Sequence, residues 1–128
     1  MCGIVGLFLK DTSLEPQLGD MLTDMLITMT DRGPDSAGIA IYGEETAGCA
    51  KLTVQSGNPE QDFAGLENAL AKHITGKVSM RVKDTHAVLE MQADQVAAAR
   101  AALGTINPAI RVMSPGEALE LSKEVGMP

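Results

Sequence analysis

Cys2 is the residue with the clearest chemical potential in this chain of 128 residues. Removal of Met1, which a small second residue permits, would place its thiol and a free α-amino group on one residue. Cysteine reacts as the thiolate, and a neighbouring base favours that form. An α-amino group titrates at about 7.7–8.0, so it can act as the base. The sequence therefore predicts an amino-terminal nucleophile; the alternative is a small apolar residue beside the start.

A second motif follows some thirty residues later. The chain begins Met-Cys-Gly-Ile-Val-Gly, and residues 31–43 read Asp-Arg-Gly-Pro-Asp-Ser-Ala-Gly-Ile-Ala-Ile-Tyr-Gly. In this order, separated by one expected helix, the two segments resemble the class II glutamine amidotransferases, which carry an amino-terminal nucleophile. The likeness is greatest to the amidotransferase-like subunits of glutamate synthase and N-methylglutamate synthase systems. The motifs cover residues 2–43.

The resemblance implies a reaction and a role for each matching residue. Cys2 would attack glutamine, forming a glutamyl thioester and giving ammonia to a synthase partner. Arg32 and Gly33 would lie beside the nucleophile, where a permanently charged guanidinium favours thiolate. Structural support of the site would come from three further residues. Asp35 and Ser36 would tie the turn together through local hydrogen bonds, and Gly38 would let the next strand pack closely.

The substrate-binding half of the family pattern is absent from the sequence. Acyl transfer needs donors aimed at the oxyanion, which the family supplies from an Asn-Gly pair, and here Asn58, Asn68 and Asn107 precede Pro, Ala and Pro. We therefore expect the chain to be the amino-terminal part of the enzyme, incomplete and inactive alone. Two alternatives remain open: a catalytically silent scaffold or regulatory subunit, and a different amino-terminal-nucleophile amide hydrolase.

Three segments are expected along the chain, in an α+β fold. Residues 1–49 would form the amino-terminal part of the glutaminase domain, the first strands and helix of an αββα layer fold. The apolar run at 3–9 predicts a buried strand, which would pair antiparallel with a strand at 37–42. Between them, apolar residues at helical spacing predict a helix: Leu18, Met21, Leu22, Met25, Leu26 and Met29.

The middle segment, residues 50–113, has a different pattern. Strands are expected at 51–55, 77–82, 85–91 and 110–113, and helices at 62–72 and 95–103. This β-α-β-β-α-β order predicts a ferredoxin-like insertion module. Residues 114–128 would form a short helix leading to the chain end or to missing residues, because Ser114 and Glu117 have the spacing of a capping box.

Composition excludes several classes of function. The net charge of −7 argues against nucleic acid as a partner. No apolar run approaches the roughly 20 residues that span a bilayer, and two cysteines make no disulfide framework, so we expect a cytoplasmic protein. No metal-ligand spacing or phosphate loop is present, and no cofactor is expected. The expected partners are glutamine as substrate and either a synthase-type protein or a second copy of the chain.

Overall fold

The computed structural model describes residues 3–126. It is an α+β structure of short helices and antiparallel pairing, as predicted. The chain forms two compact units. One contains the residues up to Gly38 together with those from Lys123 onward, and the other is Ile39–Ser122. Among the described residues no helix has the length and apolarity needed to cross a membrane.

The larger unit is built on a four-stranded sheet. Its strand order is β3-β4-β2-β5, and every neighbouring pair is antiparallel. The strand bounds are β2 (Cys49–Gln55), β3 (Ser79–Lys83), β4 (His86–Gln92) and β5 (Arg111–Gly116). All four strands predicted for the middle segment are present. Alternation of apolar and polar residues was therefore a reliable signal for these strands, since one face of this sheet packs into the hydrophobic core.

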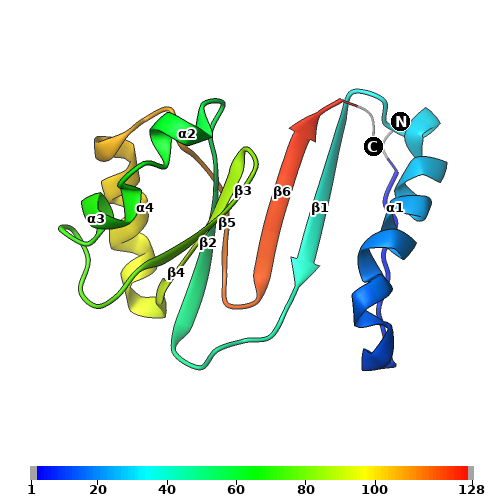
Figure 1. The fold of residues 1–128 in the computed structure, drawn as a ribbon, viewed down its shortest axis with the longest axis horizontal. Helices are drawn as coiled ribbons and strands as arrows, with labels where there is room; N and C mark the ends of the chain where they lie inside the picture. The colour runs from blue at the N-terminus through cyan, green and yellow to red at the C-terminus, as the bar shows by residue number, and fades with distance from the viewer. Residues whose placement is uncertain (1–2, 127–128) are drawn as a thin grey trace. The chain divides into compact units, whose positions relative to one another are not determined.

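Three helices lie on one face of the sheet (Figure 1). They are α2 (Pro59–Asp62), α3 (Leu66–Leu70) and α4 (Val96–Ile106), the last preceded by a 3₁₀ turn at Ala93–Gln95. The helix predicted over 62–72 is divided at Gly65. This residue adopts a left-handed conformation with φ of 70°, which a glycine adopts without the steric cost that a side chain brings.

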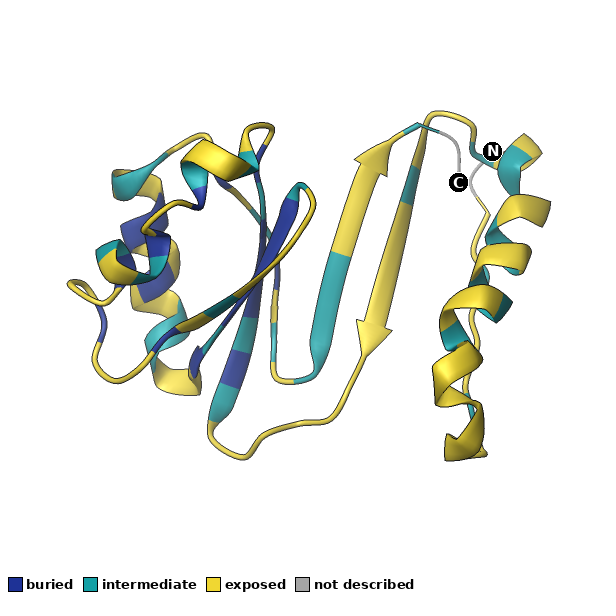
Figure 2. Ribbon diagram, in the orientation of Figure 1, coloured by how far each residue is buried: buried dark blue, intermediate teal, exposed yellow. Residues whose placement is uncertain are grey.

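The hydrophobic core lies between these helices and the sheet (Figure 2). Leu52 and Val54 of β2, Leu89 of β4 and Leu70 of α3 are all completely inaccessible to solvent. Burial of one such side chain contributes about 1.5–3 kcal/mol relative to its exposure. This unit therefore has the packing of an independent domain.

The amino-terminal unit has no comparable core. It contains a 3₁₀ helix (Thr12–Gln17), α1 (Leu18–Thr28) and a 3₁₀ turn (Thr30–Arg32). None of residues 3–38 is buried. The strand predicted over residues 3–9 is wrong: no strand forms there, and Ile4 and Phe8 are 95% and 85% exposed. A strand needs a neighbour for its backbone groups, and none of the strands β1–β6 pairs with this segment.

A separate two-stranded sheet joins β1 (Ser36–Tyr42) and β6 (Leu119–Val125). The strand predicted at 37–42 is therefore confirmed, but its predicted pairing with residues 3–9 is not. The short helix expected after residue 114 is also wrong, because β5 continues to Gly116 and β6 follows. Pairing with β1 outweighs the local capping signal, a common tertiary override of helical preference.

Candidate functional site

The predicted site residues that the structure describes lie around the end of α1. Cys2 itself lies outside the described residues. Its neighbour Gly3 lies against the turn after α1: a β-carbon placed on Gly3 would be 3.5 Å from Cβ and 3.6 Å from Cδ of Arg32, and would overlap Cε of Met29. The backbone next to the candidate nucleophile therefore passes directly beside Arg32.

Local hydrogen bonds position Arg32 at this place. The N–H of Met29 donates to the carbonyl of Leu26 at 2.9 Å, and the N–H of Arg32 donates to the carbonyl of Met29 at 2.9 Å. The N–H of Gly33 donates to the carbonyl of Thr30 at 3.2 Å, closing a tight turn. Pro34 follows and cannot continue a helix. The sequence thus ends the helix at the point where Arg32 meets the amino-terminal segment.

The other motif residues lead from this turn into β1. The carbonyl of Asp35 accepts a hydrogen bond from the N–H of Gly126 at 2.9 Å, which joins the turn to the end of β6. Ser36 is the first residue of β1, and Gly38 lies within it. The side chains of Asp35 and Ser36 form no hydrogen bond within residues 3–126. The contact between this turn and the end of β6 is therefore made by backbone atoms.

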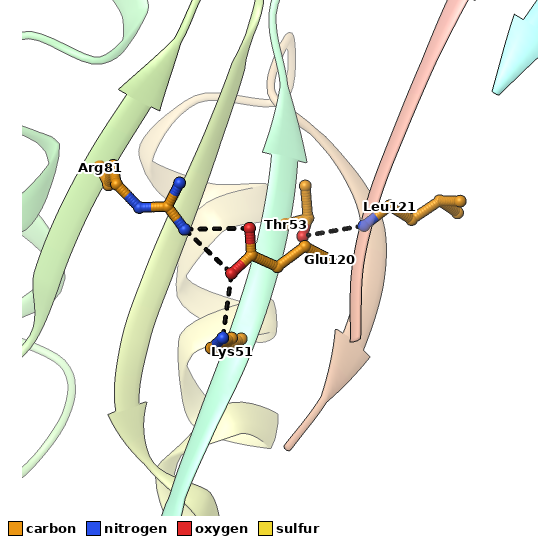
Figure 3. Close-up of polar contacts among 5 residues, drawn as sticks. All are labelled: Lys51, Thr53, Arg81, Glu120 and Leu121. Carbon is orange, nitrogen blue, oxygen red and sulfur yellow. Dashed lines mark hydrogen bonds and ion pairs between the residues drawn. The ribbon is translucent and has the colours of Figure 1, made fainter. Parts of the chain in front are cut away.

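An ion-pair cluster, not foreseen from the sequence, lies in the larger unit (Figure 3). The carboxylate of Glu120, in β6, accepts hydrogen bonds from Nζ of Lys51 at 3.0 Å and from Nη2 of Arg81 at 2.9 Å. The N–H of Leu121 also donates to the Oγ1 of Thr53 at 3.4 Å. Lys51 and Arg81 are 30 residues apart along the chain, so only the folded sheet brings them together, and no spacing rule could have found the cluster.

The two cations change the acidity of Glu120. Desolvation on its own would raise the pKa of this carboxyl, but hydrogen bonds from Lys51 and Arg81, with their positive charges, outweigh it and lower the pKa below its ordinary value of 4.5. A carboxylate with a lowered pKa stabilises the folded state above its unfolded pKa. That contribution is lost as the pH falls from about 4.5 through the lower folded pKa.

We expect Glu120→Gln to reduce the free energy of unfolding at neutral pH by about 1–3 kcal/mol, because it leaves two cations without their carboxylate. The difference from wild type should shrink as the pH falls below about 4.5 and vanish only below the lowered folded pKa, where the wild-type carboxyl is protonated too. Urea denaturation followed by circular dichroism measures both values. Glu117→Gln is the matched control, since Glu117 is exposed and in no ion pair within the described residues. Equal losses in the two variants would contradict the prediction.

The structure offers no metal centre in its described part. No group of three or more His, Cys, Asp or Glu side chains within residues 3–126 could hold a metal ion. An open hollow of about 430 Å³ lies between α2 and the β3–β4 turn, lined by Pro59, Phe63 and Val82 among others. Its lining includes the carboxylates of Glu60 and Asp84 and contains no thiol or hydroxyl group.

Comparisons with known proteins give relatives but no family model and no solved structure that matches. The chain is 59% identical over 129 aligned positions to the glutamine amidotransferase-like protein GlxB of Rhizobium meliloti (strain 1021), covering 100% of this chain and 42% of that protein. It is 56% identical over 43 residues, 34% of the chain, to a provisionally named glutamine amidotransferase of Methanothermobacter thermautotrophicus strain Delta H, covering 14% of it.

The chain thus spans about two fifths of the length of the first relative and a smaller part of the second. Both relatives carry a glutamine amidotransferase name, which supports a relationship between this chain and amidotransferase-like proteins.

Proposed function

We propose that the chain is the amino-terminal part of a class II glutamine amidotransferase, in which Cys2 releases ammonia from glutamine for a synthase-type partner. The observation that carries the proposal is the 59% identity, over the whole chain, to a protein named glutamine amidotransferase-like. The order of the two sequence motifs supports it, and so does the position of Gly3 beside Arg32.

In the proposed reaction the α-amino group of Cys2 takes the thiol proton, and the thiolate attacks the side-chain carbonyl carbon of glutamine. The carbon–nitrogen bond breaks, the proton passes to the leaving nitrogen, and ammonia departs from a glutamyl thioester. Water then attacks the thioester, giving glutamate and restoring the thiol. The guanidinium of Arg32 would favour the thiolate at the first step.

The supporting residues keep their proposed roles. We assign Gly33 to the turn that carries Arg32, and Asp35, Ser36 and Gly38 to the connection from that turn into β1. The hydrogen bond from Gly126 to the carbonyl of Asp35 supports this assignment, because it ties the connection to a second strand.

We also propose a fold for each segment. Residues 1–49 would belong to an amino-terminal-nucleophile layer fold, and residues 50–113 to a ferredoxin-like insertion module, with 114–128 leading out of it. For the module, support comes from the strand order β3-β4-β2-β5 with antiparallel neighbours. In a split β-α-β unit the last strand lies beside the first, as β5 lies beside β2.

The test is the intact mass of the purified chain before and after incubation with 6-diazo-5-oxo-norleucine, a glutamine-like electrophile. Loss of Met1 with one adduct on Cys2 would support a processed nucleophile in a glutamine pocket. If the chain lacks the substrate-binding half, the adduct should form only after the synthase partner is added. Retention of Met1 would contradict the proposal, because the α-amino base would then be absent from Cys2.

A second candidate is a catalytically silent subunit of such a complex. The observation that favours it is the lack of any Asn-Gly pair among the 128 residues, because the family draws its oxyanion donors from that pair. Partner binding that survives Cys2→Ala, with no thioester trapped from glutamine in the assembled complex, would select this candidate over the first.

We expect the chain to associate with itself or with a partner, because it leaves large apolar side chains uncovered. Val125, Phe8 and Tyr42 are 91%, 85% and 77% exposed. An isolated two-stranded sheet such as β1–β6 is marginally stable in water, and the unpaired edge of a strand is a template for pairing with another chain. Sedimentation velocity over a range of concentrations measures this, and Phe8→Ser with Val125→Ser should reduce the association. A monomer at every concentration would contradict self-association.

A further inference from the structure

The strand β3 forms an edge of the four-stranded sheet, because β4 is the only strand that pairs with it in the described part of the chain. In an antiparallel sheet the backbone groups of successive residues point alternately to one side of the strand and to the other. The N–H of Met80 points away from β4, since it donates to Oε1 of Glu67 at 2.8 Å. Val82 lies two residues further along β3. Its N–H and C=O therefore also point away from β4, toward the open edge.

The hollow between α2 and the β3–β4 turn adjoins this edge, because Val82 is part of its lining. Val82 lies on the helix-covered face of the sheet, since it pairs with Ala87, which is completely buried in the core. The helices nevertheless leave Val82 49% exposed, whereas Phe63, which also lines the hollow, is 3% exposed. Pro59 and Ala64 complete the apolar lining. The hollow thus presents apolar surface directly beside the open backbone groups of β3.

Two carboxylates complete the lining, those of Glu60 in α2 and Asp84 in the β3–β4 turn. Both residues are exposed, and neither forms an ion pair within residues 3–126. No basic residue lines the hollow in the described structure. An apolar surface flanked by two carboxylates is complementary to a side chain that has an apolar stem and a cationic end.

We propose that the edge of β3 and this hollow together bind an extended, basic segment of a partner protein, which adds a strand to the sheet. The residue opposite Val82 in the added strand exchanges two backbone hydrogen bonds with it. Directly opposite side chains lie on the same face of a sheet, so the side chain of that residue enters the hollow. Backbone pairing then supplies affinity, and the hollow supplies specificity.

Arginine has the chemistry that this hollow favours. Its stem packs on apolar residues such as Phe63, and its guanidinium offers five donors to the carboxylates of Glu60 and Asp84. The site is short, because Glu67 already occupies the N–H of Met80. All these residues lie in the larger unit, and the proposal does not depend on Cys2 or on glutamine chemistry.

The probe is a fluorescein-labelled nine-residue peptide with one central arginine among threonines and serines. Its binding to the full 128-residue chain is followed by fluorescence anisotropy at low ionic strength, where charge contacts are least screened. We expect saturable binding that weakens about tenfold in Glu60→Gln with Asp84→Asn, and about tenfold when glutamine replaces the arginine of the peptide. Asn suits position 84, where φ is 50°, because Asn tolerates the left-handed region. Absence of saturation at about 1 mM protein would overturn the proposal.

A second pair of peptides separates strand addition from attraction between charges alone. Methylation of the backbone nitrogen of the arginine retains its charge but removes the donor that pairs with the carbonyl of Val82, so binding should be lost. Methylation at the next residue, whose N–H points away from β3, should change the affinity less than about twofold. Equal affinities of the two methylated peptides would show that no strand is added at this edge.

The matched protein control is Glu45→Gln with Glu117→Gln, an equal change of charge at two exposed positions outside the lining of the hollow. It should change the affinity less than about twofold. Equal weakening by both pairs would reduce the effect to net charge and contradict the proposal. Loss of self-association in the Glu60 and Asp84 variant would also contradict it, by assigning the hollow to a second copy. If that variant does not fold by circular dichroism, Glu60→Gln alone replaces it.

Discussion

We expect Cys2→Ala to abolish both the reaction of the chain with 2-cyanobenzothiazole and any glutamine hydrolysis by an assembly that contains it. The nitrile group of this reagent condenses with a thiol and a free amine on the same residue and releases ammonia. In a protein, the resulting adduct therefore identifies an amino-terminal cysteine. Loss of a catalytic nucleophile lowers turnover by several orders of magnitude, because the covalent intermediate no longer forms. Intact mass gives the first result, and coupled assay of glutamate gives the second.

Cys49→Ala is the matched control, because Cys49 is the other cysteine and lies partly buried within β2. The nitrogen of Cys49 is part of a peptide bond, so this residue has no free α-amino group. Its replacement should leave the benzothiazole adduct and the glutamine hydrolysis unchanged. Glutamine hydrolysis that persists in Cys2→Ala would rule out the amidotransferase mechanism for this chain. An adduct absent from the wild-type chain would show that Met1 remains or that the amine is blocked, and the chemistry proposed for Cys2 would fail.

The elements that could be predicted from the sequence are those whose pattern has a burial counterpart in the structure. β2 and β4 alternate between a core and an opposite face, and their boundaries agree with the predicted strands within two residues. α1 follows the stripe of Leu and Met residues closely, although that stripe is only half-buried. Periodicity therefore located elements correctly, since it reports what each segment can bury.

The failures have a different physical origin. Residues 3–9 are apolar enough for a buried strand, but no strand of the described structure pairs with them. Residues 114–117 have the capping residues of a helix, yet this stretch ends β5, and β6 pairs with β1. In both places the outcome depends on which distant segment is available for pairing, and a local pattern carries no information about that.

The same distinction applies to the candidate site. Arg32 and Gly33 could be singled out from a motif, and Gly3 does lie beside Arg32. The pairing of Glu120 with Lys51 and Arg81 could not be predicted from the sequence, because it joins β2, β3 and β6 across the sheet face.

The largest loss of stability is expected for Leu52→Ala. Leu52 lies in β2, which is paired on both edges, and its side chain is fully buried in the core that also contains residues of α3 and α4. Truncating a buried leucine removes its transfer free energy and leaves a cavity, at a typical cost of about 2–5 kcal/mol. The free energy of unfolding of a small domain is only about 5–15 kcal/mol in total. We therefore expect the larger unit of this variant to be close to unfolding at room temperature.

Urea denaturation followed by far-ultraviolet circular dichroism is the suitable measurement, because the chain has no tryptophan and one tyrosine. Val54→Ala and Val82→Ala form a matched pair within the same sheet, with side chains 0% and 49% exposed. The first should cost roughly 1.5–3 kcal/mol and the second less than about 1 kcal/mol, since only a buried methyl leaves a cavity. Equal costs for the two valines would contradict the prediction, because they would show that burial of the side chain does not determine the cost.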